Sequence, residues 1–265
     1  MKGVFDFSYR LPKRTYALLG SCAFLVILFA WYSVTSTGLI KEFFLPSPLS
    51  VGRSLIDLFA EHGFWKDCQA SFYRITIGYL LAVCLAVPLG ILMGSFHICE
   101  AFLEPLNNFV RYTPLPAFIP LIVLWCGIGD VNQITVIFLG VFFSLLVMVA
   151  DSVSNMPKEL LETAYTLGIK RKKVLLFVIL PNSLPGIYDS LRVAIGWAWS
   201  SLIMAEVVGA NTGIGHMIME SQRFLRTANV MAGILVVGLL GILLDYLFKA
   251  FYPLLFRWTE KSRRL

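Results

Sequence analysis

The sequence predicts an all-α membrane protein, a polytopic bundle of about six transmembrane helices. Among its 265 residues 58% are hydrophobic and only 14% are charged, and the mean hydropathy is +0.77. A soluble domain of this length would need more charged residues to cover its exterior. We therefore expect one transmembrane domain, over residues 16–251, and no sizeable soluble domain.

Six segments are apolar enough to be considered as spans, since crossing the hydrocarbon core takes about 20 helical residues. They are residues 16–34, 72–93, 115–127, 134–151, 185–208 and 230–251. Pro114, Pro116 and Pro120 interrupt the start of the third segment. Because membrane helices tolerate proline when neighbouring groups satisfy the freed backbone, we expect a kinked or partly re-entrant helix there.

Lysine and arginine are concentrated in three of the segments that flank these spans. The three are residues 1–15, the loop after the fourth span, and the basic tail at residues 252–265. With six spans all three lie on one side of the membrane, and their basic residues place that side in the cytosol. Both termini are therefore expected to be cytoplasmic. The first span is too long for the apolar region of a signal peptide and no A-x-A site follows it, so we expect it to remain as a helix.

Residues 45–60 are too polar to span the membrane, but their apolar residues recur at helical spacing. The turn at Pro46-Ser47-Pro48 would start this helix. The pattern predicts an amphipathic helix that lies at the external membrane interface.

Residues 154–181 separate the fourth and fifth spans and predict two short helices. Pro157 suits the first turn of the first helix. The carboxylates of Glu159 and Glu162 interact favourably with the positive N-terminal end of the helix dipole. The apolar stripe of this helix consists of Leu160, Leu161, Ala164 and Leu167. Gly168 is expected to end it, because glycine adopts the left-handed conformation without steric cost.

Four consecutive basic residues, 170–173, open the second short helix, and Pro181 is expected to end it. Two interpretations of the whole segment are open from the residues alone. The basic run could contact anionic lipid head groups. Alternatively, the first helix could lay its apolar face into a groove of a cytosolic protein.

The run ETAYTLGIKRKKVLLFVILP resembles the EAA signature of the membrane subunits of ABC importers. The matching residues are Glu162, Ala164, Gly168, Leu180 and Pro181, whereas Thr163 replaces the first alanine and Val178 the isoleucine. Three further segments, FLPSPLSV, PLPAFIPLIVLWCGIGD and AEVVGANTGIGHMIMESQRFLRTANV, look like the nitrate, sulfonate, taurine and bicarbonate group of these permeases. The resemblance covers nearly the whole chain and favours the docking interpretation.

This resemblance implies a type I ABC importer permease fold in the bacterial inner membrane. The implied partners are a second permease copy in a homodimer, two cytosolic ATPase subunits and an extracytoplasmic solute-binding protein, with no nucleic acid among them. The helix at residues 157–168 would be the coupling helix that contacts the ATPase. The residues implied to take part in coupling are Glu159, Glu162, Ala164, Leu167, Gly168, Leu180 and Pro181.

The sequence contains no GxxxxGK[ST] phosphate-binding loop. ATP and Mg²⁺ would therefore be bound by the partner ATPase, and this chain is not expected to be an enzyme. The five cysteines and three histidines show no metal-ligand spacing. Neither a cofactor, a metal site nor a catalytic residue is predicted in this chain.

The fifth span is the most polar and supplies the candidates for a translocation path. These are Arg192, Trp197, Ser200, Ser201 and Glu206. A charge at mid-membrane costs about 2.5–3.5 kcal/mol, so an ionisable residue in a span usually lines a path or pairs with another group. Arg192 and Glu206 are fourteen positions apart, about 21 Å along a helix, and cannot pair with each other. A path role and interhelical bonding are both open for them, and the serines suit either solute contact or close helix packing.

Two glycine motifs outside the fifth span indicate close approach of the backbone. Gly90 and Gly94 form a GxxxG pair that favours helix packing. Residues 211–215 predict a tight external turn. The polar residues that follow this turn, and that could help to receive the binding protein, are Gln222, Arg223 and Arg226.

The leading interpretation is the membrane-spanning subunit of an ATP-driven importer for a small anion. An aliphatic sulfonate or taurine is favoured, because HMIMESQRFLRTANV looks nearer to those members, and nitrate or bicarbonate are the other candidates. The alternative is a stand-alone secondary transporter or channel, which predicts inverted repeats and acidic sites at the membrane midplane. A membrane-embedded enzyme would need clustered His, Asp or Cys residues. The sequence shows neither pattern.

Overall fold

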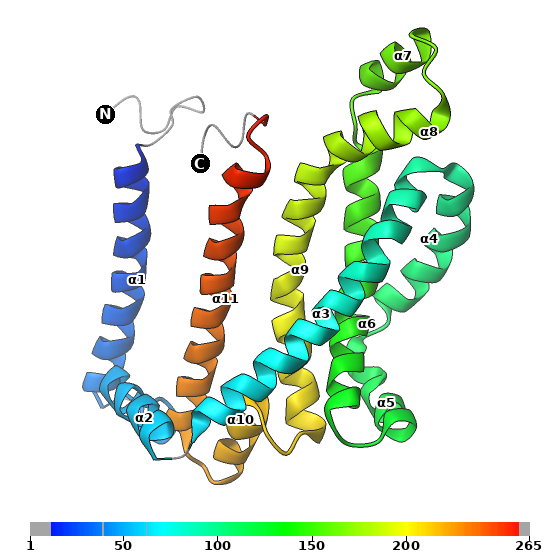
Figure 1. Cartoon of the computed structure of the whole chain (residues 1–265). Helices are drawn as coiled ribbons and strands as arrows, with labels where there is room; N and C mark the ends of the chain where they lie inside the picture. Colours follow the sequence, from blue (N-terminus) through cyan, green and yellow to red (C-terminus); the bar gives the residue numbers. More distant parts are fainter. Residues whose placement is uncertain (1–11, 39, 62, 260–265) are drawn as a thin grey trace. The chain divides into compact units, whose positions relative to one another are not determined.

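The computed structural model describes residues 12–38, 40–61 and 63–259, and every regular element in these ranges is helical (Figure 1). The predicted N-terminal segment and basic tail lie in large part outside the described residues, which leave out 1–11 and 260–265. The chain divides into two compact units. The first comprises Met1–His62 and Ser221–Ala232, and the second comprises Gly63–Glu220 and Gly233–Leu265.

The first unit contains α1 (Lys13–Ser36) and α2 (Pro48–Ala60). Ser47 caps α2 by accepting a hydrogen bond from the Ser50 backbone N–H at 3.2 Å, and the proline that follows it suits the first helical turn. The indole N–H of Trp31 donates to the Pro46 carbonyl at 3.1 Å. Helix α2 covers most of the predicted segment 45–60, with its first helical residue at Pro48, and its place at the external membrane interface stays a prediction.

The second unit contains most of the other helices. They are α3 (Phe64–Ser95), α4 (His97–Tyr112), η1 (Leu115–Ala117), α5 (Ile119–Cys126), α6 (Asp130–Ser154), α7 (Lys158–Thr166), α8 (Arg171–Val174), the π-helical turn η2 (Leu175–Ile179) and α9 (Leu180–Gly209). Two helices, α10 (Ile214–Arg223) and α11 (Thr227–Leu255), each have residues in both units.

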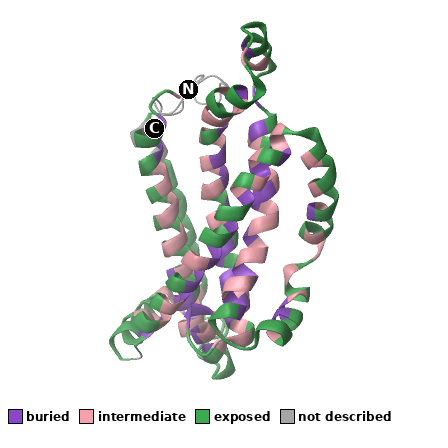
Figure 2. Cartoon of the chain, turned by 45° about the vertical axis from the view of Figure 1, so that its right-hand side comes forward, coloured by how far each residue is buried: buried purple, intermediate pink, exposed green. Residues whose placement is uncertain are grey.

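Helices α3, α6 and α9 form the packed centre of the second unit, and their facing sides carry most of its buried residues (Figure 2). Small residues allow this close contact. A Cβ atom on Gly90 would lie 2.7 Å from Cβ of Val149, and one on Gly94 would lie 2.5 Å from the carbonyl oxygen of Ala150. The GxxxG pair is therefore a packing site between α3 and α6, as predicted.

Five helices in the described part of the chain are long and apolar enough to cross a membrane. A sixth crossing is made if α4 and α5, which are bent by 82° at the intervening break, count as one span. The predicted number of about six is confirmed, and the third span is broken where its prolines stand. Helix α4 was not predicted, because its charged residues lower its mean hydropathy.

The prediction that Pro181 ends a second short helix is wrong. Helices α8 and α9 form one continuous helix from Arg171 to Gly209, with Pro181 as the second residue of α9. Proline lacks a backbone N–H, so it leaves the carbonyl of a preceding residue without its usual partner. The π-helical turn at Leu175–Ile179 ends two residues before Pro181 and changes the hydrogen-bond register, which lets the helix continue through the proline.

Candidate functional site

The hairpin formed by α7 and α8 lies beyond the adjoining ends of α6 and α9 (Figure 1). Gly168 joins its two arms with φ +70°, in the left-handed region that favours glycine. The Ile169 N–H donates to the Ala164 carbonyl at 3.1 Å and the Gly168 N–H to the Tyr165 carbonyl at 2.9 Å. This pair of bonds is a Schellman motif, so the predicted glycine stop is confirmed.

The predicted coupling residues differ in their exposure. Ala164 is buried, whereas Glu159, Glu162 and Leu167 are exposed on α7. Leu180 and Pro181 are half-buried in the first turn of α9. Helix α7 thus keeps its small residue inward and leaves its carboxylates and a leucine uncovered.

The hairpin and the turn between α3 and α4 border the same hollow. Tyr165 and Arg171 line a hollow of about 350 Å³ together with Ser95, Phe96 and His97 of that turn.

At the other end of α9, Glu206 is the centre of a buried polar cluster. Its Oε1 lies 2.8 Å from Nη1 of Arg74, and the Ser71 hydroxyl lies 2.8 and 2.9 Å from its two oxygens. The N–H of Gly215 donates to Oε2 at 2.9 Å. Arg74 also pairs with Asp130, with its Nε 2.7 Å from Oδ1. The cluster joins α3, α6, α9 and α10.

The turn at residues 211–215 closes over this cluster. The Thr212 carbonyl accepts from Nη1 of Arg74 at 2.6 Å, and the Gly213 N–H donates to Oδ1 of Asp67 at 2.7 Å. Gly213 has φ +120°, and a Cβ atom there would overlap the Glu206 carboxylate. The predicted tight turn is confirmed, and its glycines are needed because the carboxylate occupies the space beside them.

Arg192 lies near the middle of α9 and belongs to a separate ionic group. Its Nε is 2.7 Å from Oδ1 of Asp245 on α11, whose Oδ2 is 2.6 Å from Nζ of Lys249. Asp189 is a more distant partner, 3.9 Å from Nη1 of Arg192. Both ionisable path candidates of the fifth span thus form ion pairs with neighbouring helices.

The other three path candidates occupy two different faces of α9. Trp197 is 41% exposed, and Ser200 is exposed beside it on a face that includes Val193 and Gly196. Ser201 is buried, and a Cβ atom on Gly140 of α6 would lie only 2.9 Å from its Cβ. Ser201 is therefore placed for packing between α6 and α9, whereas Trp197 and Ser200 stay accessible.

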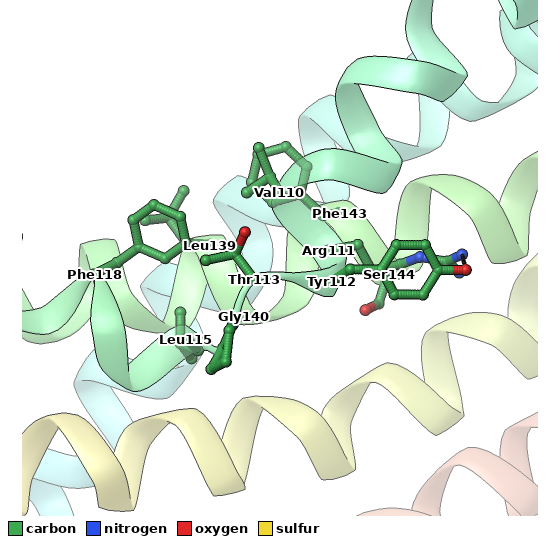
Figure 3. A pocket seen from close by; sticks show the side chains of 11 residues that line it. Val110, Arg111, Tyr112, Thr113, Leu115, Phe118, Leu139, Gly140, Phe143 and Ser144 are labelled. Carbon is green, nitrogen blue, oxygen red and sulfur yellow. Dashed lines mark hydrogen bonds between the residues drawn. The ribbon is translucent and has the colours of Figure 1, made fainter.

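A pocket of about 230 Å³ lies at the break between α4 and η1 (Figure 3). Its walls come from Val110–Leu115 and Phe118 on one side and from Leu139, Gly140, Phe143 and Ser144 of α6 on the other. Arg111 is its charged residue.

No role was predicted from the sequence for Arg74, Asp130 or Arg111. Arg74 falls inside the predicted span at residues 72–93, and a charge within a span is a signal that could have identified it. Arg111 stands three residues before Pro114. Its place beside a pocket depends on where the helix breaks, and the sequence alone does not show that position.

The bundle of membrane-crossing helices, the protruding hairpin and the broken helix define a membrane-embedded transport subunit. The chain belongs to the family described as the binding-protein-dependent transport system inner membrane component, whose model matches residues 86–261. This confirms the family that residues 162–181 predicted.

Several relatives are similar over most of their length. The taurine transport system permease protein TauC of Escherichia coli is 33% identical over 94% of this chain and 93% of its own. The aliphatic sulfonates transport permease protein SsuC of Bacillus subtilis is 32% identical over 89% of this chain and 85% of its own. The bicarbonate transport system permease protein CmpB of Synechococcus elongatus is 30% identical over 92% of this chain and 89% of its own.

Solved structures support the fold. The inward-facing MetNI methionine ABC transporter includes a chain that aligns with a TM-score of 0.58 at 19% identity, covering 72% of this chain and 98% of its own. A chain of an amino acid ABC transporter aligns with a TM-score of 0.53 at 16% identity, covering 76% of this chain and 94% of its own. The predicted ABC importer permease fold is confirmed.

Proposed function

We propose that the chain forms, with a second copy, the translocation path of an ATP-driven importer for a small anion, and that α7 couples it to a cytosolic ATPase. An aliphatic sulfonate or taurine is the favoured solute. The observation that carries the proposal is the α7–α8 hairpin, which bears the family signature and presents uncovered carboxylates and Leu167, 74% exposed, at one end of the bundle.

The orientation follows from the basic residues. Lys170–Lys173 belong to the same hairpin, and in a bacterial inner membrane the side rich in lysine and arginine is the cytosolic one. With α7 in the cytosol, the Glu206 cluster would lie at the extracytoplasmic side, where a solute-binding protein would dock. Both termini would then be cytoplasmic.

The continuous helix from Arg171 to Gly209 gives the coupling a physical route. Its start is an arm of the hairpin, and Glu206 lies 35 residues further on, about 52 Å along the axis. Because this helix is continuous, a displacement imposed at the hairpin can reach its other end. Closure of two ATPases on ATP would pull the hairpins together and displace the Glu206 clusters, so that the path opens alternately to each side.

The relatives and the accessible face of α9 both support this solute class. The relatives named for taurine, aliphatic sulfonates and bicarbonate all carry solutes with an anionic group. Trp197 and Ser200 supply an aromatic surface and a hydroxyl on the accessible face of α9. Such a face suits passage of a small polar solute without tight binding, because conduction requires that the solute can leave.

Co-purification tests whether α7 binds the ATPase. In a complex purified through a tag on the ATPase, Glu162→Arg is expected to lower the recovered permease about tenfold, equivalent to about 1.4 kcal/mol of binding free energy. Glu61→Arg, the same charge reversal at an exposed carboxylate of the first unit, is the matched control and is expected to leave recovery unchanged. Equal recovery of both variants would contradict the coupling assignment and favour a stand-alone transporter.

A further inference from the structure

We propose that the pocket at the break between α4 and η1 binds the anionic group of the solute, with Arg111 as its charged contact. The inference rests on the proposed function, since it takes the solute to be a small anion. It adds a residue and a place in the membrane where that anion is recognised.

Arg111 gives this mostly apolar pocket a cationic hydrogen-bond donor that suits an oxyanion. Nη2 of Arg111 lies 3.2 Å from the Tyr112 hydroxyl oxygen (Figure 3). It also lies 3.2 Å from Oδ1 of Asn108, and both of these acceptors are neutral. The guanidinium also lies over the Tyr112 ring, 5.0 Å from its centroid. In the described part of the chain no carboxylate forms an ion pair with it. Its remaining N–H groups are therefore available to the oxygens of a sulfonate or carbonate.

Two hydroxyl groups add to the site. The Tyr112 oxygen accepts from Arg111 and so keeps its own proton, which it can donate to an anion. Ser144 of α6 lines the opposite wall. Thr113 lines the pocket as well, but its hydroxyl donates to the Phe109 carbonyl at 2.9 Å and contributes no proton. A volume of about 230 Å³ accommodates a sulfonate group on a short alkyl chain.

The pocket lies level with the middle of α6, a helix long and apolar enough to cross a membrane. Gly140, in its wall, is 10 residues from the first residue of α6 and 14 from the last, about 15 and 21 Å along the axis. An arginine at this depth costs about 2.5–3.5 kcal/mol on insertion scales, and such residues face a bundle interior or a water-filled cavity. Arg111 is exposed on the surface of the single chain, so its guanidinium has to face a path or a partner rather than lipid.

The distribution of polar and apolar residues around α4 indicates whether Arg111 faces the path or lipid. One face of the helix carries Glu100, Glu104, Asn108 and Arg111 at helical spacing. The opposite face carries Ile98, Phe102, Leu106 and Phe109, all more than half exposed. The apolar face suits lipid, which turns Arg111 toward the aqueous path. Glu104 is seven residues away, about 10 Å along the axis, and is too far to neutralise the guanidinium.

The experiment measures the charge preference of the pocket directly. In a variant with the five native cysteines replaced by serine, Thr113→Cys places a thiol in the pocket. The permease, assembled with its ATPase in proteoliposomes, is treated with 2-sulfonatoethyl methanethiosulfonate, an anionic alkyl sulfonate, or with the cationic trimethylammonium reagent. The ratio of the anionic to the cationic rate is expected to fall about five- to tenfold on adding Arg111→Gln and to be kept by Arg111→Lys.

The control is Arg53→Gln, which removes an exposed arginine of α2 and should leave the ratio unchanged. An equal ratio with and without Arg111 would overturn the proposal. A thiol that reacts with neither reagent would overturn it too, because a solute site has to be open to water.

Measuring taurine uptake distinguishes a failure of the Arg111 site from a failure of the proposed importer function. If the native complex imports taurine with ATP, Arg111→Gln is expected to slow uptake at low taurine about tenfold, with Arg111→Lys restoring part of it. Unchanged uptake would refute the Arg111 site and leave the importer assignment intact. If the native complex imports no taurine but thiol reactivity depends on Arg111, the anion site stands and the choice of solute fails.

Discussion

Replacing Glu206 with alanine removes the acceptor that joins α3, α9 and α10. The variant loses the 2.8 Å contact to Arg74, the 2.8 Å contact to the Ser71 hydroxyl and the 2.9 Å bond from the Gly215 N–H. The side chains of Glu206 and Arg74 are 0% and 5% exposed, so water cannot replace these bonds without opening the bundle.

The magnitude follows from the charge that is left behind. Removing one partner of a buried ion pair costs about 3–5 kcal/mol, because the other charge stays buried without compensation. Arg74 retains Asp130, whose side chain is 54% exposed, and both contacts to Thr212. These remaining partners place the expected loss near the lower limit, at about 3 kcal/mol of unfolding free energy.

Unfolding of the purified permease by SDS in mixed micelles, followed by tryptophan fluorescence, measures this loss. Arg74→Met alone should also destabilise the protein, but the double variant should lose less than the sum of the two, by about 1–3 kcal/mol, because no charge remains stranded. Glu61→Ala, at an exposed carboxylate, is the matched control and should change the free energy by less than about 0.5 kcal/mol. A loss below about 1 kcal/mol for Glu206→Ala, or additive losses in the double variant, would refute the cluster as described.

Three further predictions concern glycines, each checked by the same unfolding assay unless stated. Gly90→Leu should destabilise the bundle by about 1–3 kcal/mol, because the new side chain overlaps Val149, and an unchanged midpoint would count against the α3–α6 packing. Gly140→Ala should be destabilising because it meets Ser201, and Ser201→Gly in the same chain should recover most of the loss. Gly168→Ala should destabilise the hairpin by about 1 kcal/mol, because residue 168 has φ +70°, which alanine adopts only with strain. The loss should be measured as faster hydrogen exchange in α7 with no change in α3.

Much of the fold could be predicted from the sequence because hydrocarbon imposes simple requirements. The long apolar runs that became α3, α6 and α11 satisfy their backbone internally, so length and hydropathy are enough to find them. The stop at Gly168 and the start of α2 at the Pro46-Ser47-Pro48 turn were recognised because a left-handed stop and a proline turn are local properties of the chain.

What the sequence did not reveal depends on contacts between distant segments. Arg74 and Glu206 are 132 positions apart, and only packing of α3 against α9 turns two isolated charges into a pair. Pro181 was predicted to end a helix because the preceding π turn has no recognised sequence signal. Helix α4 was missed because its polar face hides its membrane location from a hydropathy window, and with it Arg111.

The central claim is that this chain is the membrane path of an ATP-driven importer for a small anion. It is tested most directly by reconstituting the permease with its ATPase in proteoliposomes, adding the solute-binding protein outside, and following labelled taurine. The account predicts that taurine accumulates only when ATP is enclosed and the binding protein is present. Accumulation that needs neither of these, and that instead follows an imposed proton or sodium gradient, would contradict it.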